Sequence, residues 1–136
     1  MVRQRVLHTD SPAEVVARLR RLPPAFSDAL VELMKWRGCT VETLAEWAQT
    51  SVRTIQRLRT GQVRPTLKRA VAICVALGLP FALALEMMRK ADPYPCSRDY
   101  LVYLELLPIV YQQGMDMFQF NDVLVEYGAA PIGHND

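Results

Sequence analysis

Helix-capping residues and glycines recur along this chain at intervals of about one short helix, and this punctuation restricts the possible folds more than any other feature. Between these residues, apolar side chains repeat three or four positions apart, as they do on one face of a helix. No segment shows the strict alternation of apolar and polar residues that is typical of a half-buried strand. The sequence therefore predicts an all-α fold.

The caps and breaks also predict where the helices lie and how the chain is divided. We expect helices at about 12–21, 25–37, 41–48, 52–59, 67–77, 80–90, 100–107 and 117–127. Pro108 is expected to interrupt or kink the seventh of these, and the last residues are expected to fray. The predicted parts are an N-terminal helical segment (1–24), a compact domain (25–91) and a helical C-terminal extension (97–128).

Charge is distributed unevenly along the chain. Residues 1–70 contain thirteen Lys and Arg and six Asp and Glu, which gives a net charge of +7. Residues 71–136 contain three bases and eight acids, a net charge of −5. A basic half beside an acidic half suggests a polyanionic partner for the first half, although an uneven solvated surface would show the same counts.

Several classes of protein are disfavoured by composition. The three cysteines are far apart in the sequence, and the two histidines lie near the ends. We therefore expect no metal site, no cofactor and no catalytic activity, and a reducing cytoplasmic location. No apolar run is long enough to span a membrane.

Residues 40–61 contain the most informative pattern, which is two short capped helices joined by a turn of about three residues. This spacing is typical of a helix-turn-helix motif. When Ile55 and Leu58 face the core, four residues of the second helix point outward: Val52, Arg53, Gln56 and Arg57. Arg and Gln can make paired hydrogen bonds to guanine and adenine edges in the major groove of DNA. These four residues are the predicted base-reading set.

Residues 26–88 resemble the Cro/phage-repressor (XRE-type) helix-turn-helix family. The resemblance is carried by L-A-E-W-A-Q-T-S-V-R-T-I-Q-R-L-R-T-G (44–61), R-P-T-L (64–67) and I-C-V-A-L-G-L-P (73–80). It implies a five-helix DNA-binding fold in which residues at the positions of Val52, Arg53 and Arg57 read bases, with Gln56 as a further candidate. It also implies a phosphate contact from Thr60. The complete set of predicted phosphate-contacting residues is Thr40, Ser51, Arg59, Thr60, Arg64 and Lys68.

The sequence departs from the family pattern at three positions. Val41 stands where a glutamine usually touches the DNA backbone, and Arg59 stands where an acidic residue is usual. Gln49 takes the place of the turn glycine, and a left-handed backbone there would cost about 1 kcal/mol. The lost glutamine contact and the added arginine charge roughly offset each other.

The predicted domain leaves apolar residues where the family has a polar surface, and something must cover them. These residues are Ala72, Val75, Ala82 and Leu83. The apolar stretches at 101–111 and 117–125 are the candidate covers, by packing back in cis, by forming a two-fold dimer, or by both.

Two functions from different classes are compatible with these patterns. The first is a sequence-specific, repressor-like transcriptional regulator of a prokaryote or mobile element, which binds double-stranded DNA as a homodimer. The second is an antitoxin or adaptor that binds a partner protein through residues 97–127.

Overall fold

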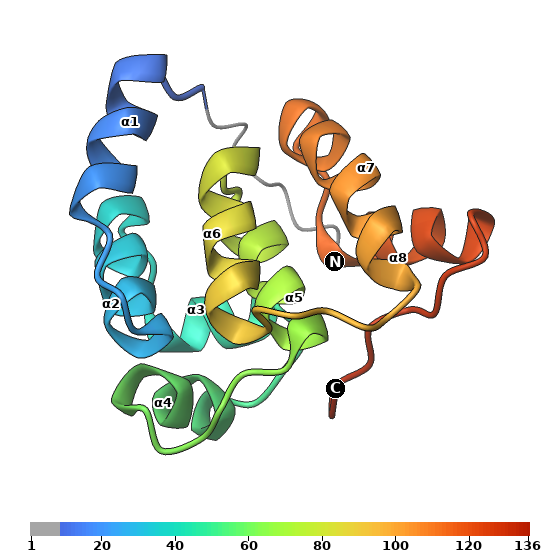
Figure 1. Ribbon diagram of the computed structural model, residues 1–136. Helices are drawn as coiled ribbons and strands as arrows, with labels where there is room; N and C mark the ends of the chain where they lie inside the picture. The colour runs from blue at the N-terminus through green and yellow to red at the C-terminus, as the bar shows by residue number, and fades with distance from the viewer. Residues whose placement is uncertain (1–8) are drawn as a thin grey trace.

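The computed structural model describes residues 9–136, and within this part of the chain there are eight α-helices and no strand (Figure 1). The helices are α1 (Pro12–Arg21), α2 (Phe26–Arg37), α3 (Val41–Trp47), α4 (Val52–Thr60), α5 (Leu67–Leu77), α6 (Phe81–Ala91), α7 (Asp99–Gln113) and α8 (Met117–Glu126). The all-α prediction is confirmed. None of these described helices is long and apolar enough to cross a membrane.

The helix bounds follow from the capping chemistry that the sequence predicts. The side chains of Ser11, Thr40, Ser51 and Thr66 each accept a hydrogen bond from the backbone N–H three residues later. Each cap satisfies one of the backbone donors that have no partner inside a helix. At the other ends, Gly38, Gly61, Gly78 and Gly114 adopt left-handed conformations with φ between 61° and 76°. Glycine adopts this conformation without the steric cost that other residues incur.

Helix α5 lies at the centre of the molecule. Ten of its eleven residues are buried, and it contacts α2, α3, α6, α7 and α8. Ala72, Val75 and Leu83 are at most 1% exposed, so most of the predicted apolar face is covered. Ala82 is exposed, and its assignment to that face was wrong. Because α7 and α8 pack on α5, and α7 also packs on α6, the extension covers this face within the same chain.

Helix α7 runs through Pro108, so of the expected interruption or kink the interruption is contradicted. Pro108 itself is exposed, whereas Leu106, Leu107 and Val110 around it are buried. A proline leaves the carbonyl four residues earlier without its helical donor, but on an exposed face water can replace that bond. The buried neighbours supply the packing that keeps the helix continuous.

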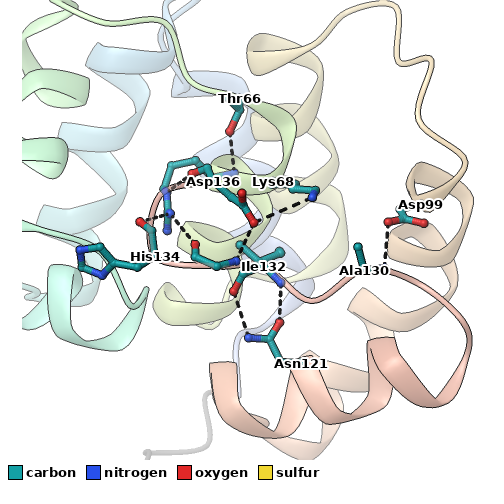
Figure 2. Close-up of polar contacts among 10 residues, drawn as sticks. Thr66, Lys68, Asp99, Asn121, Ala130, Ile132, His134 and Asp136 are labelled. Atoms are coloured by element: carbon teal, nitrogen blue, oxygen red, sulfur yellow. Dashed lines mark hydrogen bonds and ion pairs between the residues drawn. The ribbon is translucent and has the colours of Figure 1, made fainter.

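The last residues are anchored, and the expectation that they fray was wrong. Asn121 of α8 exchanges two hydrogen bonds with the backbone of Ile132, at 2.9 and 3.1 Å, and Ile132 is 2% exposed (Figure 2). The Asp99 carboxylate accepts a hydrogen bond from Ala130 N–H at 3.2 Å. Residues 129–136 are therefore held along the domain as an ordered strap.

Arg69 binds the end of this strap to the domain. Its side chain is 3% exposed and donates to the carbonyl oxygens of Gly133, His134 and Asp136 at 2.8–3.0 Å. It also donates to the carbonyl of Ala48, at the end of α3, at 3.1 Å. A buried cation is tolerated only when its donors are satisfied, and here carbonyl groups supply the acceptors.

A second buried cation joins the start of the described chain to the domain. Arg37 binds both carboxylate oxygens of Asp10, at 2.8 and 2.9 Å, and both side chains are 7% exposed. Arg37 also donates to the carbonyls of Leu77 and Gly78, at 2.9 and 2.7 Å. The Tyr111 hydroxyl donates to the same Asp10 carboxylate at 2.8 Å. This cluster connects α2, the end of α5 and α7.

Replacing Arg69 with methionine is expected to lower the free energy of unfolding by about 2–3 kcal/mol, because four carbonyls lose their donor in a buried place. Amides of residues 129–136 should then exchange hydrogen faster. Urea denaturation and hydrogen exchange measure the two effects. The same change at exposed Arg64 serves as the control and should alter neither.

Replacing Tyr103 with phenylalanine is expected to raise the free energy of unfolding at pH 7 by about 1 kcal/mol. The Tyr103 hydroxyl is buried and has no hydrogen-bond partner among the described residues. Urea denaturation of the variant at pH 7 tests this, and a loss of stability there would show that the hydroxyl is satisfied.

The same variant should also respond differently to alkali. Burial, reinforced by Asp99 and Asp136, raises the pKa of Tyr103 to about 12. Because this pKa lies above that of the unfolded chain, ionisation of Tyr103 does not lower the free energy of unfolding below pH 10, and it lowers this free energy progressively as the pH rises through about 12. The phenylalanine variant should therefore lose less stability than the parent between pH 10 and 12.

Candidate nucleic-acid interface

Helix α4 has one face in the core and the opposite face in solvent. Ile55 and Leu58 are 0% and 2% exposed, and they fix the helix against α2 and α3. Val52 at the start of the helix is 37% exposed. The structure thus places the predicted base-reading residues on the solvent side, as helical periodicity requires.

The polar residues of that face gather around one shallow hollow. Its lining consists of Arg53, Gln56, Arg57, Thr60 and Gln62. Arg53 and Gln56 are exposed, and Arg57 is partly exposed. Gln62 was not among the sequence-predicted site residues, because it follows the helix-ending glycine and no helical periodicity applies to it. The hollow therefore presents two guanidinium groups and two amides, all capable of hydrogen bonding to base edges or phosphates.

The turn before α4 has the strained geometry that the sequence suggests. Gln49 adopts a φ of 58°, the only left-handed non-glycine residue in the described chain. Its neighbours Ala48 and Thr50 are buried, so the turn is held from both sides. Packing offsets the cost of about 1 kcal/mol for this conformation. The strain thus lies in the segment that sets the angle between α3 and α4.

Three of the predicted phosphate contacts come from hydroxyl groups that already form bonds within the protein. Thr40 donates its hydroxyl proton to the Thr43 hydroxyl at 2.9 Å. Thr60 donates to the carbonyls of Gln56 and Arg57 at 3.1 and 3.2 Å. Each of these two must give up an internal bond before it can donate to a phosphate.

Ser51 differs because its hydroxyl shares one hydrogen bond with the Thr54 hydroxyl, at 2.8 Å, and either group can be the donor. One proton of this pair stays available for an outside acceptor. The pair can therefore contact a phosphate without breaking the cap that Ser51 provides to the Thr54 N–H.

Arg59 does not lie with the other predicted contacts of α4. Its side chain lines a second hollow together with Thr40, Val41 and Lys35, on the side of α2 and α3. Its Nε is buried and has no hydrogen-bond partner among the described residues. Residues two positions apart on a helix point about 200° apart, so helical spacing already separates Arg59 from Arg57. Lys35, whose side chain is 72% exposed, joins this second group although the sequence did not single it out.

The remaining predicted phosphate contacts lie at the start of α5. Arg64 is exposed in the loop after α4. Lys68 forms an ion pair with Asp136 at 3.9 Å, and both side chains are more than one third exposed (Figure 2). An ion pair this exposed contributes little free energy, so Lys68 can exchange Asp136 for a phosphate at small cost.

The basic residues of α1 are placed differently. Helix α1 packs against α6 and stands well apart from α4 in Figure 1. The Arg18 guanidinium lies over the Trp36 ring, 5.6 Å from its centre. The fold therefore places α1 away from α4.

Two of the three thiols in residues 9–136 are at least partly buried, whereas the Cys96 thiol is exposed. This part of the chain contains no group of three or more His, Cys, Asp or Glu residues placed to hold a metal ion. Burial raises the pKa of the Cys74 thiol to about 12, and burial also raises the pKa of Cys39. Neither thiol is therefore activated as a nucleophile.

The family comparison agrees with the geometry of α2 to α6. Comparison of the chain with curated proteins and with solved structures gave no significant match. Residues 25–87, however, match a family model described as a helix-turn-helix domain. This match does not distinguish the Cro/phage-repressor type from other helix-turn-helix types. It supports a similarity to helix-turn-helix domains for the segment that begins just before α2 and ends within α6.

Proposed function

We propose that this protein is a sequence-specific, repressor-like transcriptional regulator that reads the major groove of DNA with α4. The observation that carries the proposal is the hollow on the solvent face of α4, where Arg53, Gln56 and Arg57 come together. The opposite face of the helix is fixed in the core by Ile55 and Leu58. A rigid helix that presents such side chains is what direct readout requires.

The dimensions and chemistry of α4 suit this role. Nine residues make a helix about 14 Å long, and the major groove is about 12 Å wide. The arginines can bind guanine through two hydrogen bonds, and Gln56 can bind adenine in the same way. Val52 offers an apolar contact for a thymine methyl group.

Two groups of cations flank α4 and suit the phosphates on either side of a groove. Arg64 and Lys68 lie at the start of α5, and Arg59 and Lys35 lie with Thr40 at the start of α3. We assign the phosphate contacts to these groups, with Ser51 and Thr60 between them. Such contacts fix the position of a protein on the duplex without carrying sequence information.

The acidic extension sets the orientation of the complex. Helices α7 and α8 lie on the side of the molecule away from α4 (Figure 1). A duplex repels their carboxylates and attracts the cations beside α4, so long-range electrostatics favours the same orientation as the base contacts.

A homodimer on paired half-sites is the second part of the proposal. One short helix reads only a few base pairs, and proteins of this architecture commonly bind two half-sites about one helical turn of DNA apart. Since α7 and α8 already cover α5 in cis, no second copy is needed for that purpose.

We also infer that the domain is of the Cro/phage-repressor type and that the protein has no catalytic activity. We infer a cytoplasmic location, because prokaryotic DNA is found there.

A protein-binding adaptor or antitoxin is the second candidate function, and it is compatible with the first. The observation that favours it is the exposure of large apolar side chains on α7 and α8, among them Leu101 and Phe118, each 68% exposed. Solitary exposed apolar residues are common, but a group of them suggests an interaction surface.

Substitution of base-reading and phosphate-binding residues should have distinct effects. Arg53→Ala and Arg57→Ala should each cost about 1–3 kcal/mol of specific binding and relax the preference at one base position. Arg64→Ala should weaken binding to all duplexes alike and reduce the salt dependence by about one unit. Lys68→Ala should do the same to a smaller extent, because Lys68 must first leave Asp136. Fluorescence anisotropy across a salt series, with selected and random duplexes, measures both effects.

The assignment of roles depends on that difference between the variants. If Arg53→Ala and Arg64→Ala changed the affinities for selected and random duplexes equally, the orientation proposed for α4 would be wrong.

Selection of bound sequences from a random duplex pool should yield a palindrome whose two halves are centred about 10 base pairs apart. Sedimentation velocity on the selected duplex should then show two protein chains per duplex. A selected site without two-fold symmetry, occupied by one chain, would contradict the homodimer. It would not contradict the proposal that α4 reads the bases.

A further inference from the structure

A mainly apolar groove lies on the outer side of α7, next to the end of α8. We call it the α7 groove, and its lining consists of Leu101, Val102, Glu105, Leu106, Ile109 and Tyr127. Leu101, Ile109 and Tyr127 are 68%, 41% and 65% exposed. Large apolar side chains that remain this exposed around one concavity leave apolar surface in water, and burying that surface against a partner is favourable.

The charged residues of the segment that forms the α7 groove are all acidic. Residues 99–136 contain six carboxylates and no Lys or Arg. Glu105 lies in the groove itself, and Glu126 directly precedes Tyr127 at the end of α8. The one base of the extension, Arg98, comes immediately before α7. A partner that binds in the groove must therefore complement an apolar lining and the nearby carboxylates of Glu105 and Glu126.

We propose that the α7 groove binds an amphipathic helix of a partner protein, with apolar residues at helical spacing and Lys or Arg beside them. Apolar side chains three, four and seven positions apart would enter the groove, as in other helix-in-groove complexes. The flanking cations would face Glu105 and Glu126, which favours basic partners and opposes acidic ones. This proposal extends the adaptor candidate and does not depend on DNA binding.

Charge argues against a second copy of this chain as the occupant. In a two-fold dimer the same patch meets itself, so the carboxylates of both copies would be brought together. No cation of residues 99–136 could compensate them. Like charges placed opposite each other oppose association. The same carboxylates repel a nucleic acid.

The position of the groove allows both partners to bind at once. Helix α7 lies on the other side of α5 and α6 from α4 in Figure 1. A helix in the α7 groove would not cover Arg53, Gln56 or Arg57. The protein would thus hold a second protein beside the DNA that it reads.

The test is a selection from a displayed library of helical peptides with randomised surface positions, using the full-length protein as bait. We expect enriched peptides to combine apolar residues at i, i+3, i+4 and i+7 with Lys or Arg beside them. The affinity of one such peptide is then measured by fluorescence anisotropy. Leu101→Ser should weaken it about tenfold, and Glu105→Lys should weaken it by a smaller factor.

Phe118→Ser is the matched control. Phe118 is as exposed as Leu101, and it lies on α8 outside the groove. This variant should bind the peptide like the parent protein. All three variants should bind a selected duplex unchanged, so failure of the groove proposal and failure of DNA binding would be seen separately.

Three outcomes would overturn the proposal. The first is a selection that enriches no peptides, or acidic ones. The second is binding that Leu101→Ser does not weaken. The third is self-association of the protein without DNA that Leu101→Ser abolishes in sedimentation velocity, which would make a second copy the occupant.

Discussion

An α-helix that is apolar on every side cannot remain at a protein surface, and this constraint on α5 organises the rest of the molecule. Ten of its eleven residues are buried, Arg69 included. Helices α2, α3 and α6 cover part of α5, and α7 and α8 cover the rest. Helices α2 to α6 and the acidic extension therefore share one core. The extension is part of the fold, because without it α5 would lie open to water.

The solvent face of α4 is rigid because buried residues and helix caps fix α4 and the turn before it. Ile55 and Leu58 of α4 are buried, while Arg53, Gln56 and Arg57 line one hollow on its solvent face. Caps hold the first turns of α3, α4 and α5, and buried residues on both sides hold the left-handed Gln49. In the proposed complex with DNA, such a preorganised surface would lose little conformational entropy on binding, so more of the contact energy would remain for discrimination between bases.

Much of this could be predicted from sequence, because the signals are local. A capping side chain and a glycine a few residues away define a helix within one or two positions, and periodicity defines its buried face. The features that were missed depend on residues far apart in the chain. Arg69 meets carbonyls more than 60 positions later, and Arg37 meets Asp10 and the end of α5. No spacing rule reveals such pairs. Helical spacing separates Arg59 from Arg57, but the residues of α2 and α3 that Arg59 meets are set by the tertiary fold.

The bond from Arg69 to Ala48 and to residues 133–136 has a consequence for the order of folding. The carbonyl of Ala48 ends the first helix of the helix-turn-helix motif, and the three other acceptors of Arg69 come from residues 133–136. A ribosome makes residues 133–136 after α1 to α8. The helix-turn-helix motif therefore emerges before Arg69 has all of its carbonyl acceptors. During synthesis the Arg69 guanidinium must keep water as its partner. The helix-turn-helix motif therefore acquires its final rigidity only when residues 129–136 have bound Arg69.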